Sequence, residues 1–171
     1  MQKMQSSAIN LQIMKASLEK IVINVGIGRF STQSNFNEKI LPEIMKDLAA
    51  ITGQKASPRP AKQSISGFKL REGIIVGLKI TLRGKRMEDF LKRLNGIVLP
   101  RVRDFRGIDL KKIDKNGNLS IGVKEHVVFP EIKADATNVN FGIEITMVPK
   151  RIKSRDEAIT LYRQLGVPLK K

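Results

Sequence analysis

The sequence contains no cysteine and no tryptophan, and it has a single histidine and a single tyrosine among 171 residues. The lack of cysteine excludes disulfide frameworks, zinc ribbons, iron–sulfur ligation and a cysteine nucleophile, and it is typical of a reducing compartment. His126 has no second histidine with which to share a metal, so we interpret it as a histidine at a strand end. We therefore expect no metal, no cofactor and no catalytic residue.

Acidic residues are also scarce. The 16 aspartates and glutamates oppose 32 lysines and arginines, which gives a formal net charge of +16 and a pI near 10.4. Because this excess is spread along the chain, it predicts a basic face on a folded body rather than a basic arm. With 41% hydrophobic residues, the chain can bury one core, and we expect residues 1–171 to form a single domain.

Long apolar runs are missing as well. No stretch approaches the roughly 20 residues that a membrane-spanning helix needs, and the N-terminus MQKMQSSAINLQIMKASLEK lacks the apolar core of a signal peptide. The helices expected here show no basic stripe opposite large apolar residues, which disfavours a peripheral membrane protein. The sequence therefore predicts a soluble, cytoplasmic protein with no membrane partner.

The strongest feature present is a basic run at residues 53–86, GQKASPRPAKQSISGFKLREGIIVGLKITLRGKR, in which Glu72 is the one acidic residue. Its first half reads as a loop. The repulsion among its cations is relieved when a polyanion neutralises them together and releases counterions, so the simplest partner is nucleic acid. The loop cations are Lys55, Arg59, Lys62, Lys69 and Arg71.

Residue periodicity indicates the fold class. Apolar residues that alternate with small or polar ones predict four strands, at residues 18–25, 76–83, 119–124 and 140–147. Helical spacing predicts helices at residues 36–52, at residues 87–94 with an end at Pro100, and at residues 154–165 behind a Ser154–Glu157 capping box. Asn116-Gly117 predicts a hairpin turn preceded by a short strand at residues 110–113. We expect an α+β fold, a largely antiparallel open sheet with helices packed on one face and the other face free for RNA.

The polar row of these strands has no aromatic residue on which a base could stack. Its glycines allow a sugar–phosphate backbone to approach closely. Its lysines and arginines can contact phosphates, and its amide and hydroxyl groups can reach 2′-hydroxyls or base edges. Structured RNA is therefore favoured over splayed single strands. Any one of these residues is equally compatible with merely facing water. The row comprises Lys20, Asn24, Gly77, Lys79, Thr81, Arg83, Ser120, Gly122 and Lys124.

Two enzymatic alternatives are weak. Gly26-x-Gly28 follows a strand, but Ser31 stands where a dinucleotide fingerprint requires glycine, and no parallel strand-helix-strand unit follows. Asp104 and Asp109 lie in PRVRDFRGIDLKK, where they more plausibly pair with arginines than form an acid/base couple. An RNA-processing or nucleotide-dependent enzyme would need a carboxylate cluster or a complete phosphate loop, and the sequence shows neither.

Several ordered segments are distinctive, namely LEKIVINVGIG, ITGQKASPRPAKQSISGFKLREG, GLKITLRGKRMEDFLKRL, LPRVRDFRGI and GVKEHVVFPEI. Together they resemble the family of bacterial large-subunit ribosomal protein five. The likeness extends from Leu18 to Pro168, while residues 1–17 align poorly. The resemblance implies an α+β domain of the cytoplasmic large ribosomal subunit that binds 5S rRNA, anchors it in the central protuberance and touches 23S rRNA. It implies no enzyme, no cofactor and no small-molecule substrate.

The resemblance also implies site residues. A glycine-rich loop of Gly67, Phe68, Lys69, Arg71 and Glu72 would reach peptidyl-site tRNA, whereas Phe68 taken alone could equally be a buried anchor for its loop. Asp114, Lys115 and Asn116 would meet small-subunit ribosomal protein thirteen across an intersubunit bridge. The implied 5S rRNA contacts are Lys20, Asn24, Gly26, Gln54, Lys55, Arg59, Lys62, Gln63 and Ser64, to which the strand pattern adds Lys79 and Arg83.

Overall fold

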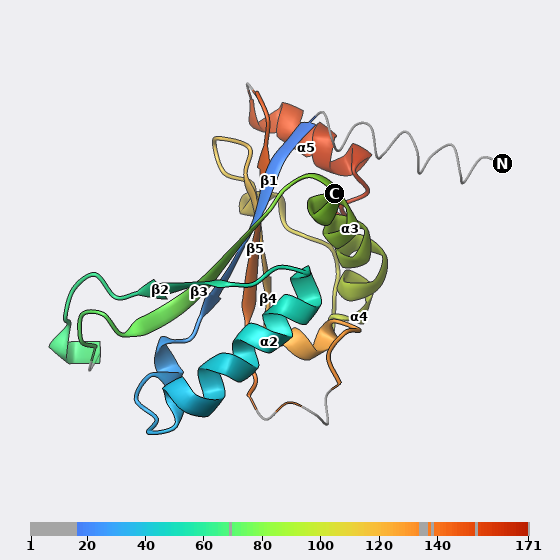
Figure 1. The fold of residues 1–171 in the computed structure, drawn as a ribbon. Coiled ribbons are helices and arrows are strands. Elements are labelled where there is room, and N and C mark those ends of the chain that lie inside the picture. The colour runs from blue at the N-terminus through green and yellow to red at the C-terminus, as the bar shows by residue number, and fades with distance from the viewer. Residues whose placement is uncertain (1–16, 69, 134–136, 138, 153, 171) are drawn as a thin grey trace. The chain divides into compact units, whose positions relative to one another are not determined.

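The fold is built on one five-stranded antiparallel sheet with strand order β2-β3-β1-β5-β4 (Figure 1). The computed structural model describes residues 17–68, 70–133, 137, 139–152 and 154–170. Together with the helices, this sheet confirms the predicted α+β class. The strands are β1 (Leu18–Gly26), β2 (Ser57–Pro60), β3 (Ile75–Leu82), β4 (Leu119–Val123) and β5 (Ile143–Pro149).

The helices begin and end where local sequence signals require. A π-helical turn (Phe36–Ile40) leads into α2 (Leu41–Thr52), which has Pro42 in its first turn and ends at Gly53 with a φ of 67°. These two segments confirm the helix predicted at residues 36–52. In α5 (Arg155–Gln164), the Ser154 side chain accepts the Glu157 N–H, as expected of the predicted cap.

The helix that begins with α3 (Gly84–Arg93) is longer than predicted. It continues through a π-helical turn (Leu94–Val98) into α4 (Leu99–Arg101), so Pro100 does not end it. The change of hydrogen-bond spacing in the π turn starts a new short helix, and Pro100 then occupies a first-turn position, where proline is tolerated.

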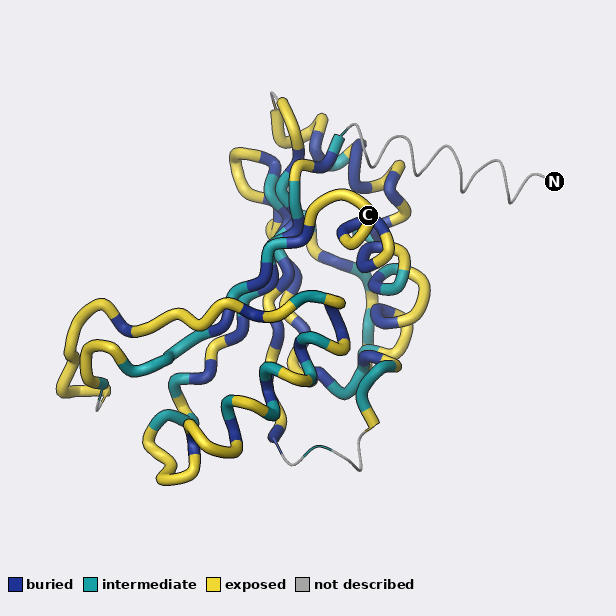
Figure 2. The backbone as a smooth tube through the Cα atoms, viewed as in Figure 1, coloured by how far each residue is buried: buried dark blue, intermediate teal, exposed yellow. Residues whose placement is uncertain are grey.

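Burial alternates along the strands, as Figure 2 shows. One row of side chains is buried while the row between them is half-buried or exposed, which confirms that helices cover one face only. The helices complete the core with apolar side chains from α2, α3 and α5. The buried strand row includes Ile21, Ile23, Val25, Leu78, Ile80, Leu82, Leu119, Ile121, Val123, Ile143, Ile145 and Met147.

The chain forms two compact units. Unit 1 comprises Met1–Val22, Thr81–Ile121 and Ile145–Lys171, and unit 2 comprises Ile23–Ile80 and Gly122–Glu144. Unit 1 holds α3 and α5, whereas unit 2 holds α2 and β2. Because β1, β3, β4 and β5 each contribute residues to both units, a single domain over residues 1–171 stays our prediction.

Two further local predictions were wrong. Residues 57–60, expected in a loop, form the edge strand β2, which pairs antiparallel with β3 through Ser57 opposite Lys79 and Arg59 opposite Gly77. An edge strand tolerates the two prolines that made this segment look irregular. The strand expected at residues 110–113 is instead a 3-10 turn, because Asp109 Oδ1 accepts the Lys111 N–H at 2.9 Å and Ile113 alone bridges to Leu119.

Candidate nucleic-acid interface

The polar row of the sheet combines half-buried polar side chains with glycines. In unit 2, Asn24 and Lys79 are half-buried and Gly26 is exposed, with no atom close to the place of a Gly26 Cβ. A Cβ on Gly77 would lie 3.3 Å from the Val25 carbonyl oxygen, a tight contact, so glycine allows the two strands to approach closely there. Among the described strand residues, this row contains no aromatic side chain, which suits contact with a phosphate backbone.

Carboxylates also lie beside the polar row. Asn24 Nδ2 donates to Glu144 Oε2 at 3.4 Å, which orients the amide. Lys20 Nζ lies 3.0 Å from Glu19 Oε1, and the hydrogen bond from Lys20 holds the pKa of Glu19 below its usual value. Lys20 and Arg83 belong to unit 1, so the predicted 5S rRNA contacts are shared between the two units.

The predicted basic contacts of unit 2 lie on and around strand β2. Lys55, Arg59 and Lys62 are exposed, as are Gln63 and Ser64. Gln54 is half-buried, and its N–H donates to the Thr52 hydroxyl at 3.2 Å. Arg59 lies in the edge strand itself, whereas Lys55 precedes the strand and the other exposed residues follow it.

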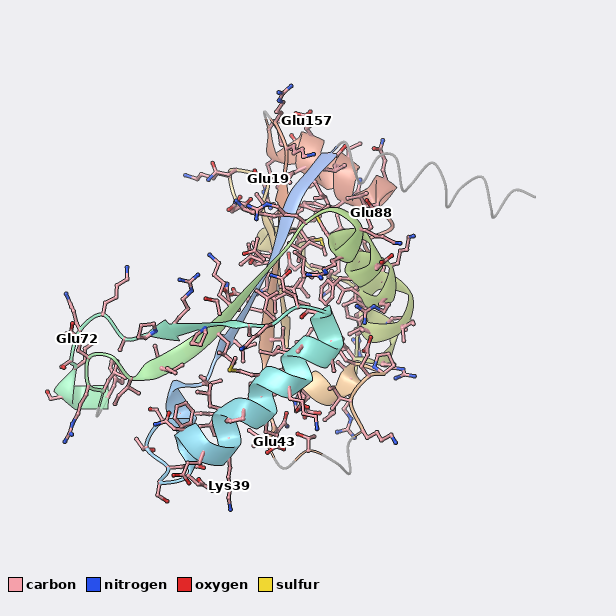
Figure 3. The ribbon with its side chains drawn as sticks, in the orientation of Figure 1. Glu19, Lys39, Glu43, Glu72, Glu88 and Glu157 are labelled. Atoms are coloured by element: carbon pink, nitrogen blue, oxygen red, sulfur yellow. The ribbon has the colours of Figure 1, made fainter. Side chains whose placement is uncertain are left out.

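The segment between β2 and β3, which we call the hairpin tip (residues 61–73), turns through a bridge of Ile65 with Leu70. Phe68 is 79% exposed, which overturns its interpretation as a buried anchor. The Glu72 N–H donates to Ser64 Oγ at 2.9 Å, and Figure 3 shows Glu72 at the far end of the hairpin. Gly67 and Arg71 are exposed, and the predicted Lys69 lies outside the described residues.

The turn at residues 114–118, which we call the Asp114 turn, is held by its own side chains. Asp114 Oδ1 accepts the N–H groups of Asn116 and Asn118 at 2.8 Å each, and Oδ2 accepts Asn118 Nδ2 at 2.8 Å. Burial raises the pKa of Asp114, but these hydrogen bonds outweigh it and leave that pKa below its usual value. Gly117 has a φ of 79°, which confirms the predicted turn, and Lys115 is exposed.

His126 is buried in a 3-10 turn (His126–Val128) of unit 2, beyond the end of β4. Its ring stacks on Phe141 with centroids 4.0 Å apart, and its Nε2 lies 3.4 Å from Asp47 Oδ2. Burial lowers the pKa of His126 against the opposing attraction of Asp47, and burial raises the pKa of Asp47. This pair joins α2 to the segment after β4 and is a structural contact.

One basic residue beside the polar row escaped the sequence analysis. Arg29 follows Gly26 and Gly28, its Nη2 donates to the Asn140 carbonyl, and its guanidinium carbon lies 4.5 Å from the Phe30 ring centroid. The signal that could have found it is the single cation that follows the glycines of IVINVGIGRF.

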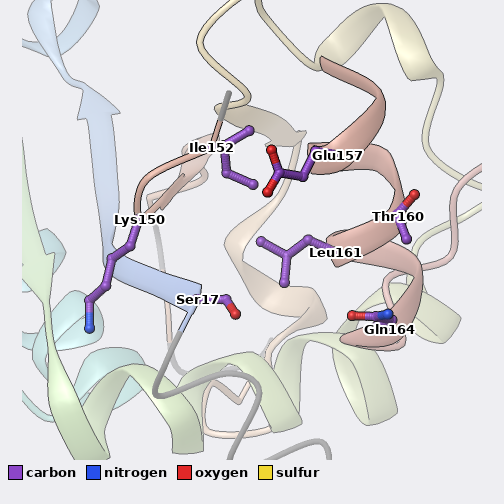
Figure 4. A pocket seen from close by; sticks show the side chains of 7 residues that line it. All are labelled: Ser17, Lys150, Ile152, Glu157, Thr160, Leu161 and Gln164. Atoms are coloured by element: carbon purple, nitrogen blue, oxygen red, sulfur yellow. The ribbon is translucent and has the colours of Figure 1, made fainter. Parts of the chain in front are cut away.

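A pocket beside α5 is lined by one cation, one carboxylate and neutral side chains (Figure 4). The Lys150 N–H donates to the Ser17 carbonyl at 2.7 Å at its rim, and Glu157 and Thr160 come from α5. In the part of the chain that the structure describes, no three histidine, aspartate or glutamate side chains gather as metal ligands. None of the described helices is long and apolar enough to cross a membrane.

Comparisons with known proteins cover nearly the whole chain. The family described as ribosomal protein L5 matches residues 13–71, and the C-terminus of the same ribosomal family matches residues 75–169. Large ribosomal subunit protein uL5 of Fusobacterium nucleatum is 48% identical over 154 residues, 90% of this chain and 81% of the relative. The uL5 proteins of Rubrobacter xylanophilus (47% over 154 residues, 90% and 83%) and Halothermothrix orenii (43% over 151 residues, 88% and 82%) are similar.

Proposed function

Because this chain belongs to the ribosomal protein L5 family, we propose that its polar sheet row and basic β2 edge bind 5S rRNA. Membership makes the protein an RNA-binding structural component of the large ribosomal subunit, which is cytoplasmic in bacteria, and not an enzyme. The finer assignment to 5S rRNA rests on the surface described above.

The observation that carries the proposal is the group of exposed cations on and around β2, beside a polar row without aromatics. Arg59 is exposed on a strand that pairs with β3, and exposed Lys55 and Lys62 flank that strand. Cations gathered on one edge neutralise phosphates and release counterions, while glycines such as Gly26 admit the sugar–phosphate backbone. Such a surface recognises the shape of folded RNA and not a base sequence.

The two exposed turns extend this assignment. In our proposal, the hairpin tip lays Phe68 against peptidyl-site tRNA, and the Asp114 turn meets small-subunit ribosomal protein thirteen through Asp114, Lys115 and Asn116. The exposure of Phe68 and of Lys115 supports both roles. Contacts with 23S rRNA complete the anchoring of 5S rRNA in the central protuberance.

The decisive experiment compares affinities for 5S rRNA, tRNA and an unrelated structured RNA of equal length across a salt titration. We expect 5S rRNA binding to survive at physiological salt while the other two weaken together, because non-specific binding is mainly electrostatic. Uniform, salt-labile binding of all three RNAs would contradict the 5S assignment and leave a generic basic surface.

Single substitutions locate the interface. Arg59→Ala or Lys62→Ala should weaken 5S rRNA binding and reduce the salt slope by about one unit for each phosphate interaction that the substitution removes. Lys39→Ala is the matched control, because Lys39 is an exposed cation outside the polar row and the β2 edge (Figure 3). A slope that stays unchanged in both variants would remove Arg59 and Lys62 from the interface.

A further inference from the structure

The dipeptide Asn-Gly occurs at two places in the chain, residues 95–96 and residues 116–117. Glycine has no Cβ, so it offers the least hindrance when its backbone nitrogen attacks the side chain of a preceding asparagine. Both dipeptides lie in unit 1, but one belongs to a helix and the other to the Asp114 turn. Their different surroundings therefore decide which asparagine can react.

Asn95 is held by the helix that contains it. It lies in the π-helical turn Leu94–Val98, and its Nδ2 donates to the Leu165 carbonyl at 3.2 Å while its Oδ1 is buried. A ring that joins Asn95 Cγ to the Gly96 nitrogen requires Asn95 to leave its helical backbone angles, which breaks hydrogen bonds of the helix. We therefore expect Asn95 to react only when this part of unit 1 unfolds.

The side chain of Asn116 is exposed, whereas the backbone around it is restrained. The Asn116 N–H donates to Asp114 Oδ1 at 2.8 Å, and the Gly117 N–H donates to the Asp114 carbonyl at 3.1 Å. Gly117 is also packed, because its carbonyl accepts the Tyr162 hydroxyl at 2.8 Å and a Cβ on it would lie 3.1 Å from Ala158 Cβ. This restraint lies within one short turn and can be lost without unfolding a helix.

We propose that Asn116 is a site of spontaneous deamidation and that the Asp114 turn sets the rate of this modification. When the turn opens, the Gly117 backbone nitrogen loses its proton and attacks Asn116 Cγ. The N–Cγ bond forms, the Cγ–Nδ2 bond breaks, and ammonia leaves with that proton, which gives a cyclic succinimide. Water then hydrolyses the ring: cleavage of the N–Cγ bond yields aspartate, and cleavage of the bond from this nitrogen to the Asn116 backbone carbonyl carbon yields isoaspartate.

The closed turn opposes this reaction. The Gly117 N–H is engaged by the Asp114 carbonyl, and the nearby Asp114 carboxylate disfavours a negative charge on the Gly117 nitrogen. The product carries a new carboxylate two residues from Asp114, and isoaspartate adds one carbon to the backbone. A modified turn therefore cannot close again with Gly117 in its packed position, so the modification records that the turn has opened. The proposal is independent of the proposed function, because it concerns the chain alone.

The test incubates the full chain in mildly alkaline buffer, either folded or in guanidinium chloride. Peptide mass spectrometry follows Asn95 and Asn116 separately, and enzymatic methylation detects isoaspartate. In denaturant we expect the two asparagines to react at similar rates, because each precedes glycine in an unfolded chain. In the folded chain the reaction at Asn116 should be at least ~10-fold slower than in denaturant, and Asn95 should stay unmodified over the same incubation.

Variants that loosen the turn provide the sharper measurement. Asp114→Ala and Tyr162→Phe should each speed the reaction at Asn116 several-fold in the folded chain, with Asn95 still unmodified. Thr52→Val is the matched control, because it also removes a buried hydroxyl, one that donates to the Leu48 carbonyl at 2.7 Å in unit 2. It should leave the reaction at Asn116 at its original rate.

Three results would overturn the proposal: equal rates at Asn95 and Asn116 in the folded chain, equal rates at Asn116 in the folded chain and in denaturant, or no acceleration in either turn variant. Modification of Asn95 in the Asp114→Ala variant would show that this variant unfolds, and Tyr162→Phe then decides the question. Asn116→Gln should abolish isoaspartate formation in the peptide that contains it; isoaspartate that persists there would assign the reaction to Asn118 and also overturn the proposal.

Discussion

The hairpin tip and the Asp114 turn are both exposed segments between paired residues, yet they are built in opposite ways. The hairpin tip exposes Phe68 and Ile65 and closes with a few backbone bonds and one serine hydroxyl. In the Asp114 turn, the carboxylate of Asp114 accepts three hydrogen bonds, and Tyr162 Oη donates to the Gly117 carbonyl at 2.8 Å.

This difference in internal hydrogen bonding determines how each segment can bind a partner. A turn whose polar groups are satisfied internally presents its exposed residues in a fixed geometry, so a partner meets it without an ordering cost. A tip with few internal contacts opens locally at low free energy and can adjust to a partner. We therefore assign rigid docking to the Asp114 turn and adaptable contact to the hairpin tip.

The largest effect is expected from Gly117→Ala. The new Cβ would lie 3.1 Å from Ala158 Cβ and 3.2 Å from Ile152 Cγ2, at a φ of 79°, so both strain and overpacking oppose it. We expect a loss of about 2–4 kcal/mol in the free energy of unfolding, measured by urea denaturation. Gly67→Ala in the hairpin tip is the matched control, because no atom lies within 4 Å of its Cβ position. Equal losses of unfolding free energy in the two variants would show that the Asp114 turn is no more tightly held than the hairpin tip.

The same denaturation curves address the domain prediction. If residues 1–171 form one domain, fluorescence of Tyr162 in unit 1 and far-UV circular dichroism should report one coincident transition. Two separated transitions would show that the units unfold independently.

A smaller loss is expected from Tyr162→Phe. The buried Tyr162 hydroxyl donates to the carbonyls of Gly117 and Met147, at 2.8 Å and 3.1 Å, and burial raises its pKa. Removal of the hydroxyl leaves these carbonyls without that donor and should lower the free energy of unfolding by about 1–2 kcal/mol. Amide exchange at Gly117 should quicken, while exchange in the hairpin tip should stay as it was. Unaltered exchange at Gly117 would show that Asp114 suffices to hold the turn.

Two lowered pKa values should reduce stability in the same direction, as pH falls, but in different pH ranges. The folded-state pKa of His126 is below its usual 6.5, so the unfolded chain binds its proton more readily and stability falls as pH drops from 6.5 to the lowered pKa. For Asp114, whose pKa is also lowered, stability is lost only as pH falls through 3.8 and below. His126→Gln should remove the first decline and leave the second, as measured by unfolding between pH 7 and pH 3. A decline near pH 6 that persists in the variant would assign it to another group.

The smallest effect on stability is expected from Phe68→Ala, because a side chain that is 79% exposed contributes little to the core. We expect a change within about 0.5 kcal/mol in the free energy of unfolding. Affinity of the assembled large subunit for peptidyl-site tRNA should nevertheless fall, since an aromatic ring can stack on a nucleotide. Ile65→Ala, the neighbouring exposed apolar residue, serves as control. Unchanged tRNA affinity would separate Phe68 from the proposed contact.

The sequence predicted those parts of the fold in which local and tertiary preferences agree. The alternation of apolar and polar residues in LKITL identified β3, and Ser154 and Gly166 marked the two ends of α5. In each case the local sequence favours the same backbone conformation as the packed fold. β2 was missed because strand propensity cannot recognise SPRP, in which pairing with β3 decides the conformation. The turn at residues 110–112 was missed because a side-chain cap at Asp109 prevailed over alternation.

The candidate site was predicted in composition but not in arrangement. Residues 53–64 were recognised as basic from charge alone, whereas the placement of Arg59 on an edge strand depends on pairing with β3. The approach of Lys170 and Arg155 to residues 107–110 could not be predicted at all, since these segments lie far apart in the sequence and meet only through long-range hydrogen bonds. Long-range contacts of this kind leave no local periodicity.

The proline in β2 has a consequence for the protein before it meets RNA. The Val76 carbonyl accepts the Ile27 N–H, so the backbone groups of the next residue, Gly77, point the other way, toward β2. Arg59 lies opposite Gly77, so its backbone groups point toward β3. The backbone groups of the preceding residue, Pro58, therefore point to the free edge of the sheet. Proline offers no donor there, so a second copy cannot extend the sheet through that position. This missing donor disfavours edge-to-edge pairing between two copies of the open sheet.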